Sequence, residues 1–167
     1  MVSAPKTLLA SAPTPLDPKT GCDAMHAHLL EQPKTRAYAP VRPQRILIID
    51  DDDAMVDVLS QRLNRQGYGI LAANSGDEGL AIARREVPHL VLLDLRLPDA
   101  DGFSVCQELA DSAETCAIPV IILSGMERPD IIRRSRAAGC QYFVRKPYDP
   151  NALLILVQHA IGDAREW

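Results

Sequence analysis

The chain has 167 residues, 47% of them hydrophobic, and a formal net charge of −4 at pH 7. This length and composition suit one domain with a substantial buried core. The negative charge gives no sign of the basic patch that nucleic-acid binding usually requires, and no apolar run approaches the roughly 18 residues of a membrane span.

The first 43 residues differ in composition from the rest of the chain. They hold seven of the thirteen prolines, and their apolar residues follow no long period. We therefore expect residues 1–43 to be a Pro-rich, mostly disordered N-terminal extension and residues 44–167 to hold the folded domain. The four cysteines are widely spaced without a C-x-x-C pair, which predicts free thiols and a cytoplasmic location.

The folded part begins with the sequence ILIIDDDD, in which four apolar residues run directly into four carboxylates. Residues 46–49 lack polar alternation, which is typical of a strand buried in a parallel sheet. Asp52 or Asp53 can cap the following helix, and Gly67 predicts its end. Within this helix the apolar residues recur every three to four positions, at Met55, Val56, Leu59 and Leu63.

The same alternation of strand and helix repeats along the rest of the chain. The sequence Ser75-Gly-Asp-Glu78 is a capping box that begins the second helix, and Asp149-Pro150 combines a helix cap with proline at the first helical position. The further predicted elements are strand 68–73, helix 75–85, strand 89–94, helix 103–110, strand 120–123, helix 129–138, strand 142–145 and helix 149–161. This (βα)5 pattern predicts an α/β fold, a doubly wound parallel five-stranded sheet with helices on both faces.

Polar residues stand at the predicted carboxyl ends of four strands. Asp50 and Asp51 follow the first strand, Asp94 ends the third, Ser124 follows the fourth and Lys146 follows the fifth. In doubly wound sheets the ligand site lies outside these strand ends, so we expect the five side chains to converge. Two carboxylates about 4 Å apart repel by roughly 4 kcal/mol at an effective dielectric constant near 20, which favours a bound cation. Mg²⁺ prefers such oxygen ligands together with water and phosphate.

These residues stand in specific sequence contexts. Asp94 lies in LLDLRLPDADG, Ser124 follows VIIL, and Lys146 lies in FVRKPY. Together with the acidic pair after the first strand, this ordered set resembles the receiver domain of bacterial two-component response regulators, over about residues 44–165. The resemblance implies the flavodoxin-like strand order 2-1-3-4-5 known for that family.

The resemblance also implies a phosphorylation site. Asp94 would accept a phosphoryl group from a phosphohistidine of a sensor histidine kinase or a histidine phosphotransfer protein, because carboxylates form such aspartyl phosphates. Asp51 and Asp94 would ligate Mg²⁺ directly, Asp50 would act mainly through water, and the backbone carbonyl of Arg96 would add a ligand. The metal would offset charge on the incoming phosphoryl oxygens. The protein would then be a phosphoacceptor in signalling and not an enzyme.

Three further residues would respond to phosphorylation if the resemblance holds. Lys146 would pair with Asp94 and then with the phosphoryl group. Ser124 would donate a hydrogen bond to a phosphoryl oxygen and move toward it, pulling its loop along. Phe143 occupies the family's switch-aromatic position and would turn inward as that loop shifts.

Two positions bear on the lifetime of the phosphoryl group. Arg96 and Met126 stand two residues after Asp94 and Ser124, where family members influence how fast water reaches the phosphorus. Neither side chain is a carboxylate or an amide that would position water. We therefore expect a phosphoryl state that is not specially short-lived.

Output is expected through protein–protein contacts of helix 129–138, strand 142–145 and the last helix. Arg133, Arg136 and Arg145 would contact an acidic partner there. Alternatively, the arginines of the helix form a solvent-exposed face that binds no partner. Few residues follow the last helix, so we expect a stand-alone receiver. It would act on a protein target or, alternatively, pass its phosphoryl group on as a phosphorelay intermediate, without binding nucleic acid or membrane.

Other interpretations compete with this one. Asp52 and Asp53 can serve only as helix caps, Ser124 can be an ordinary turn residue, and Phe143 can be simple core. A haloacid-dehalogenase-like phosphatase also combines Asp, Ser or Thr, Lys and Mg²⁺, but its nucleophile lies on the first strand in a D-x-D pattern, and here Arg96 replaces the second Asp. Flavin mononucleotide binding would need a Ser/Thr-Gly-rich loop after the first strand. A receiver used only as a protein-binding module is a further alternative.

Overall fold

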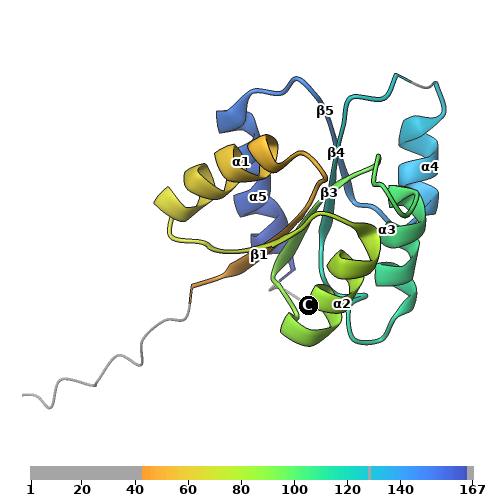
Figure 1. The fold of residues 1–167 in the computed structure, drawn as a ribbon, viewed down its shortest axis with the longest axis horizontal. Coiled ribbons are helices and arrows are strands. Elements are labelled where there is room, and N and C mark those ends of the chain that lie inside the picture. The colour runs from red at the N-terminus through yellow and green to blue at the C-terminus, as the bar shows by residue number, and fades with distance from the viewer. Residues whose placement is uncertain (1–42, 128, 165–167) are drawn as a thin grey trace, which may run out of the picture. The chain divides into compact units, whose positions relative to one another are not determined.

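Strands and helices alternate along the folded part of the chain (Figure 1). A computed structural model describes residues 43–127 and 129–164, and within them there are five strands and five helices. The strands are β1 Arg45–Ile49, β2 Gly69–Ala73, β3 Leu90–Asp94, β4 Val120–Ser124 and β5 Tyr142–Arg145. The helices are α1 Asp53–Arg65, α2 Gly76–Glu86, α3 Gly102–Asp111, α4 Ile131–Ala137 and α5 Pro150–Asp163. The predicted (βα)5 alternation is confirmed.

The strands form one parallel sheet in the order β2-β1-β3-β4-β5. This confirms the strand order that the resemblance implied. Every residue of β3 and β4 is buried, because both strands have neighbours on each edge and helices on each face. That burial explains their continuous apolar sequences. The strand order reverses between β1 and β3, so the switch point of the fold lies at the carboxyl ends of these strands.

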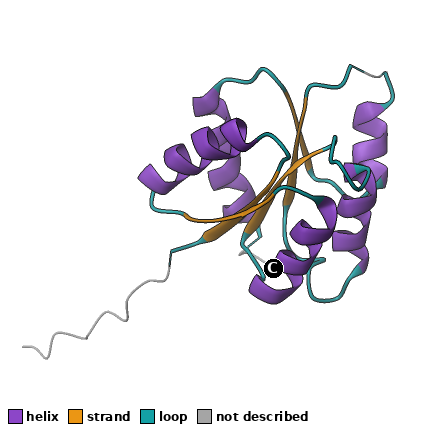
Figure 2. Ribbon diagram, in the orientation of Figure 1, coloured by secondary structure: helices purple, strands orange, loops and turns teal. Residues whose placement is uncertain are grey.

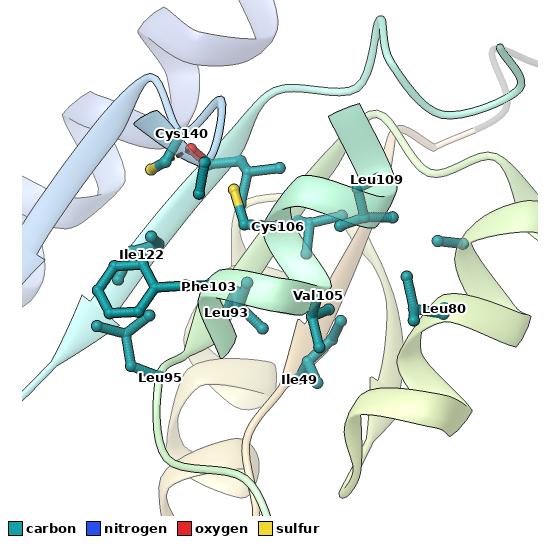
Figure 3. Packing of buried hydrophobic residues seen from close by; sticks show 14 of the residues in the cluster. Ile49, Leu80, Leu93, Leu95, Phe103, Val105, Cys106, Leu109, Ile122 and Cys140 are labelled. Carbon is teal, nitrogen blue, oxygen red and sulfur yellow. Dashed lines mark hydrogen bonds between the residues drawn. The ribbon is translucent and has the colours of Figure 1, made fainter. Parts of the chain in front are cut away.

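Two hydrophobic layers cover the sheet, with α1 and α5 on one face and α2, α3 and α4 on the other (Figure 2). Successive side chains of a strand point to opposite faces. Ile46 and Ile48 therefore pack under α1 and α5, whereas Leu47 and Ile49 pack under the other helices. Figure 3 shows the α2–α3–α4 layer, where the sheet residues Ile49, Leu93 and Ile122 lie close to the helix residues Leu80, Phe103, Val105, Cys106 and Leu109.

Acidic side chains cap the first and last helices. The Asp52 carboxylate accepts hydrogen bonds from the backbone N–H groups of Ala54 and Met55, at 3.1 and 3.2 Å. Asp53 is the first residue of α1, so of the two predicted caps Asp52 is correct. Asp149 caps α5 as expected. Each carboxylate satisfies N–H groups that have no partner within the helix.

Two helices differ in detail from the prediction. Ser75 caps α2, but the Glu78 carboxylate accepts a hydrogen bond from the Asn74 N–H at 3.1 Å, one residue before the position expected for a capping box. Helix α4 is shorter than the predicted range 129–138. Its cap residue Asp130 makes no side-chain capping bond, and the preceding residues form a turn.

Some predictions concern the chain as a whole. The extension predicted for residues 1–43 lies outside the described residues apart from Pro43, so its disorder stays a prediction. Within the described part, no helix combines the length and the apolar character that crossing a membrane requires. Cys106, Cys116 and Cys140 are free thiols, and Cys116 is exposed.

Candidate functional site

Polar residues gather at the carboxyl ends of the central strands. Asp50 directly follows β1, Asp94 ends β3, Ser124 ends β4 and Lys146 follows β5. Asp50, Asp94 and Ser124 are buried, with 3%, 5% and 0% of their surface exposed. The peptide bond between Lys146 and Pro147 is cis. We call Asp50, Asp94, Ser124 and Lys146 the strand-end site.

The Lys146 ammonium joins the two carboxylates of the strand-end site. Its Nζ lies 2.7 Å from Asp50 Oδ2 and 2.9 Å from Asp94 Oδ1. Burial by itself lowers the pKa of Lys146, but the hydrogen bonds to Asp50 and Asp94 outweigh it and raise the pKa above the ordinary 10.5. Lys146 is therefore charged at neutral pH, and its one ammonium group is shared between two carboxylates.

Backbone N–H groups hold the other carboxylate oxygens. Asp94 Oδ2 accepts a hydrogen bond from the Arg96 N–H at 2.6 Å. Asp50 Oδ1 accepts one from the Asp52 N–H at 3.0 Å. Each carboxylate is thus held from two directions. The contact between Lys146 and Asp94 agrees with expectation, whereas its shorter contact with Asp50 was not foreseen.

Ser124 completes the site at the end of β4. Its Oγ accepts a hydrogen bond from the Met126 N–H at 3.2 Å, and its backbone carbonyl accepts one from the Lys146 N–H at 2.9 Å. Phe143 is half-buried and, like Met126, packs against the α2–α3–α4 layer. Ser124 therefore engages its own loop in this state, and the switching roles of Ser124 and Phe143 stay predictions.

The acidic residues after β1 differ in their surroundings. Asp50 is buried beside Lys146, whereas Asp51 is exposed. Among the residues that the structure describes, no group of three or more His, Cys, Asp or Glu side chains is arranged to hold a metal ion. Mg²⁺ usually needs only one or two carboxylates, with water and phosphate as further ligands. The two buried carboxylates, Asp50 and Asp94, are oxygen ligands of the kind that fits this ion.

The first residue of α3 packs directly against the Asp94 backbone. A Cβ atom on Gly102 would lie 2.5 Å from the Asp94 carbonyl oxygen and 2.7 Å from Leu95 Cα. The Gly102 N–H donates a hydrogen bond to the Leu95 carbonyl oxygen at 3.1 Å. Position 102 therefore needs glycine, because any side chain would push α3 away from the end of β3. In the sequence this glycine stood out only as part of the segment that follows Asp94, and its packing role was not predicted.

Asp99 joins the loop after β3 to helix α2. Its carboxylate accepts hydrogen bonds from the backbone N–H groups of Gly76 and Asp77, at 2.8 and 2.9 Å. The hydrogen bonds from Asp77 and Gly76 hold the pKa of Asp99 below its ordinary value of 3.8. The carboxylate also lies at the positive end of the α2 dipole. The sequence did not predict this contact, because Asp99 and the start of α2 lie in separate parts of the chain.

Comparison with known proteins identifies the arrangement. Residues 46–158 match the family model described as the response regulator receiver domain. The chain belongs to this family. Receiver domains are parts of two-component signalling systems, and phosphorylation on aspartate is characteristic of them. The phosphatase and flavin alternatives gain no support from this match.

Relatives of the chain differ in how much of their own length it covers. Over 114 residues the chain is 39% identical to the DNA-binding dual master transcriptional regulator RpaA of Synechocystis sp., covering 68% of this chain and 47% of that protein. Over 110 residues it is 36% identical to protein PilH of Pseudomonas aeruginosa, covering 66% of this chain and 91% of that protein. The chain therefore spans about half of RpaA but nearly all of PilH.

Solved structures share the receiver fold. A CheY-like receiver domain protein from Methanospirillum hungatei superposes with a TM-score of 0.70 at 29% identity, covering 74% of this chain and 98% of that chain. A receiver domain of a signal transduction histidine kinase from Syntrophus aciditrophicus gives a TM-score of 0.68 at 27% identity, covering 72% of this chain and 91% of that chain. Receivers with this fold thus occur in both regulators and kinases.

Proposed function

We propose that Asp94 accepts a phosphoryl group from the phosphohistidine of a histidine kinase or a phosphotransfer protein. The supporting observation is the buried Asp94 carboxylate at the end of β3, whose oxygens are held by Lys146 Nζ and the Arg96 N–H. One carboxylate oxygen attacks phosphorus, and the bond from phosphorus to the imidazole nitrogen of the donor breaks as the new bond forms. The imidazole is then the leaving group.

The other residues of the site would interact with the negative charge of the incoming phosphoryl group. Lys146 already contacts Asp94 and can keep its ammonium beside the added phosphoryl oxygens. Asp50, Asp51, Asp94 and the Arg96 carbonyl would hold Mg²⁺, which when bound supplies positive charge against the phosphoryl oxygens. Ser124 would exchange its hydrogen bond from Met126 N–H for one donated to the phosphoryl group.

The output surface is proposed on α4, β5 and α5. Movement of Ser124 would free space beside β5, into which Phe143 can rotate. Ile155 of α5 is 68% exposed, and Arg133 and Arg136 of α4 are exposed as well, which suits a partner with acidic and apolar groups. The protein would act in the cytoplasm as a stand-alone receiver, or as a phosphorelay intermediate. A phosphoryl state of ordinary lifetime is expected.

Labelling with a small phosphodonor tests the acceptor. Incubation with acetyl phosphate and Mg²⁺ should add one acid-labile, hydroxylamine-sensitive phosphoryl group per chain, measured by intact mass. Asp94→Asn should abolish the addition. Asp53→Asn, which removes a carboxylate from the first turn of α1 outside the strand-end site, should be labelled like the wild type. Labelling of the Asp94 variant at the normal level would refute the assignment.

Beryllofluoride tests the output surface. This phosphoryl mimic, added with Mg²⁺, should shift backbone NMR signals between residues 124 and 146 most strongly, because Ser124, Phe143 and Lys146 lie in that range. The first two helices should change less. Large shifts confined to α1 and α2 would show that the proposed switch is wrong.

A further inference from the structure

Helix α4 is attached to the rest of the domain by few buried residues. It has seven residues, and its buried members are Ile131 and Ser135. The Ser135 hydroxyl donates within the helix, to the Ile131 carbonyl oxygen at 2.8 Å. Ile132 is 54% exposed, and the cap residue Asp130 makes no side-chain capping bond. A helix of this length is not stable through its own hydrogen bonds. Contacts with neighbouring elements therefore determine its position.

Arg134 provides one such contact, on the side of α4 that faces α3. Its Nη2 lies 3.2 Å from Asp101 Oδ2. Its guanidinium carbon lies 4.2 Å from the centre of the Phe103 ring, and Phe103 is itself part of the α2–α3–α4 layer (Figure 3). An ion pair or a cation–ring contact alone contributes little at a surface. Here both act on one guanidinium, so the side chain that one contact orders is already in place for the other.

Asp101 connects this contact to the loop that follows Asp94. Its other carboxylate oxygen, Oδ1, accepts a hydrogen bond from the Phe103 N–H at 3.1 Å and so caps α3. The Asp101 backbone also pairs with Arg96 in an antiparallel bridge. The loop between β3 and α3 is thereby closed on itself, with the Arg96 N–H bound to Asp94 near one end and Asp101 bound to Arg134 at the other.

We propose that the Arg134 contact, meaning Arg134 with Asp101 and Phe103, holds α4 against α3 and couples the loop after Asp94 to the position of α4. A change at Asp94 that moves this loop alters the contact, and α4 moves with it. The contact itself does not depend on phosphorylation. Its regulatory meaning rests on the proposed function, in which α4 is part of the output surface.

Hydrogen exchange of the full chain tests whether the contact holds α4. In Arg134→Gln, the backbone amides of α4 should exchange roughly 5- to 10-fold faster than in the wild type, because two modest interactions are lost. Amides of α5 should be unchanged. Arg133→Gln removes the same charge from the same helix, but the Arg133 side chain is exposed and makes no ion pair or hydrogen bond with the described residues. Equal acceleration in the two variants would overturn the proposal.

A double-mutant cycle tests the partner. Asp101→Asn keeps the cap of α3, because Asn caps helices as well as Asp, but it removes the charge that faces Arg134. The double variant Asp101→Asn with Arg134→Gln should exchange at α4 no faster than Arg134→Gln alone. If the double variant instead accelerated exchange by the product of the two single effects, the two residues would not act together.

Beryllofluoride with Mg²⁺ tests the coupling separately. The change that it causes in α4 exchange should be at least halved in Arg134→Gln, since the loop has then lost its connection to α4. An undiminished change would refute the coupling. In an Asp94→Asn background without beryllofluoride, the effect of Arg134→Gln should persist, so failure of the proposed phosphorylation and failure of the contact are distinguishable.

Discussion

Lys146 Nζ lies 2.7 Å from Asp50 Oδ2, although the two residues are 96 positions apart in the sequence. Strands β3 and β4 separate β1 from β5 in the sheet, so the long lysine side chain reaches across the ends of both. The side chains of Asp50 and Lys146 are 4% and 20% exposed. Because this pair is largely shielded from solvent, removal of the ammonium leaves a buried and unpaired charge.

The first prediction concerns this ammonium. In EDTA, Lys146→Ala should lower the free energy of unfolding by roughly 2 kcal/mol, because two buried carboxylates lose their charged partner. Mg²⁺ should recover at least half of that loss, since a cation can then occupy the space between Asp50 and Asp94. Urea unfolding in EDTA and in excess Mg²⁺ measures both effects.

Arg145→Ala is the matched control for this prediction. Arg145 precedes Lys146 in the sequence, is exposed and forms an ion pair with Glu127 at the surface. Its removal should cost little, and the cost should be the same in EDTA and in Mg²⁺. If the Lys146 variant likewise showed no difference between the two conditions, the proposed magnesium site would be refuted.

The strands and the position of the site could be predicted from the sequence for a physical reason. Strands buried on both faces must be apolar along their length, so β1, β3 and β4 stand out as continuous runs. The carboxyl ends of parallel strands meet at one edge, so polar residues directly after such runs come together. Asp50, Asp94, Ser124 and Lys146 were found in this way.

Other features could not be predicted because no periodicity encodes them. Four consecutive aspartates follow β1, and only the course of the chain decides that Asp50 is buried while Asp51 is exposed. Contacts such as Arg134 with Asp101, or Asp99 with the start of α2, join polar side chains from separate loops and helices. Helix α4 was predicted to begin at residue 129, and the sequence did not reveal that Pro129 and Asp130 form a turn before it.

The second prediction concerns Asp99 and pH. The pKa of Asp99 is lowered in the folded state, so its contribution to stability is present above the ordinary value of 3.8 and is lost as the pH falls through the folded pKa. At neutral pH Asp99→Asn should therefore be less stable than the wild type, and the difference should shrink below pH 3.8. Asp77→Asn removes a charge at the same helix end without removing an acceptor, and it should destabilise less. Thermal unfolding at several pH values measures the stability difference between the wild type and Asp99→Asn. If that difference stayed constant down to pH 2, the prediction would be contradicted.

The third prediction concerns the residue after α2. Val87 has a backbone φ of 43°, a left-handed conformation that is unfavourable for a β-branched side chain. Asn tolerates this conformation, and the 51% exposed valine loses little burial, so Val87→Asn should raise the free energy of unfolding by about 1 kcal/mol. Val58→Asn changes an exposed valine inside α1, where Val and Asn have similar helix propensity, and should be nearly neutral. Equal effects of the two substitutions in urea unfolding would show that Val87 is not strained.

The fourth prediction concerns Gly102, which supports Asp94 from behind. In Gly102→Ala the new Cβ would meet backbone atoms of Asp94 and Leu95 at 2.5 and 2.7 Å. Backbone atoms cannot rotate away as a flexible side chain can, so α3 must shift. The free energy of unfolding should fall by about 2–3 kcal/mol, and the NMR signals of Asp94 and its neighbours should move.

Gly162→Ala provides the opposite case in the same chain. Gly162 lies in the last turn of α5, and apart from the helix's own backbone a Cβ there would meet no atom of the described residues within 4 Å. Alanine is the better helix former, so this variant should gain up to about 0.5–1 kcal/mol and leave the Asp94 signals in place. Urea unfolding and NMR spectra of both variants test the pair. If Gly102→Ala were as well tolerated as Gly162→Ala, the start of α3 would not be what fixes Asp94 at the end of β3.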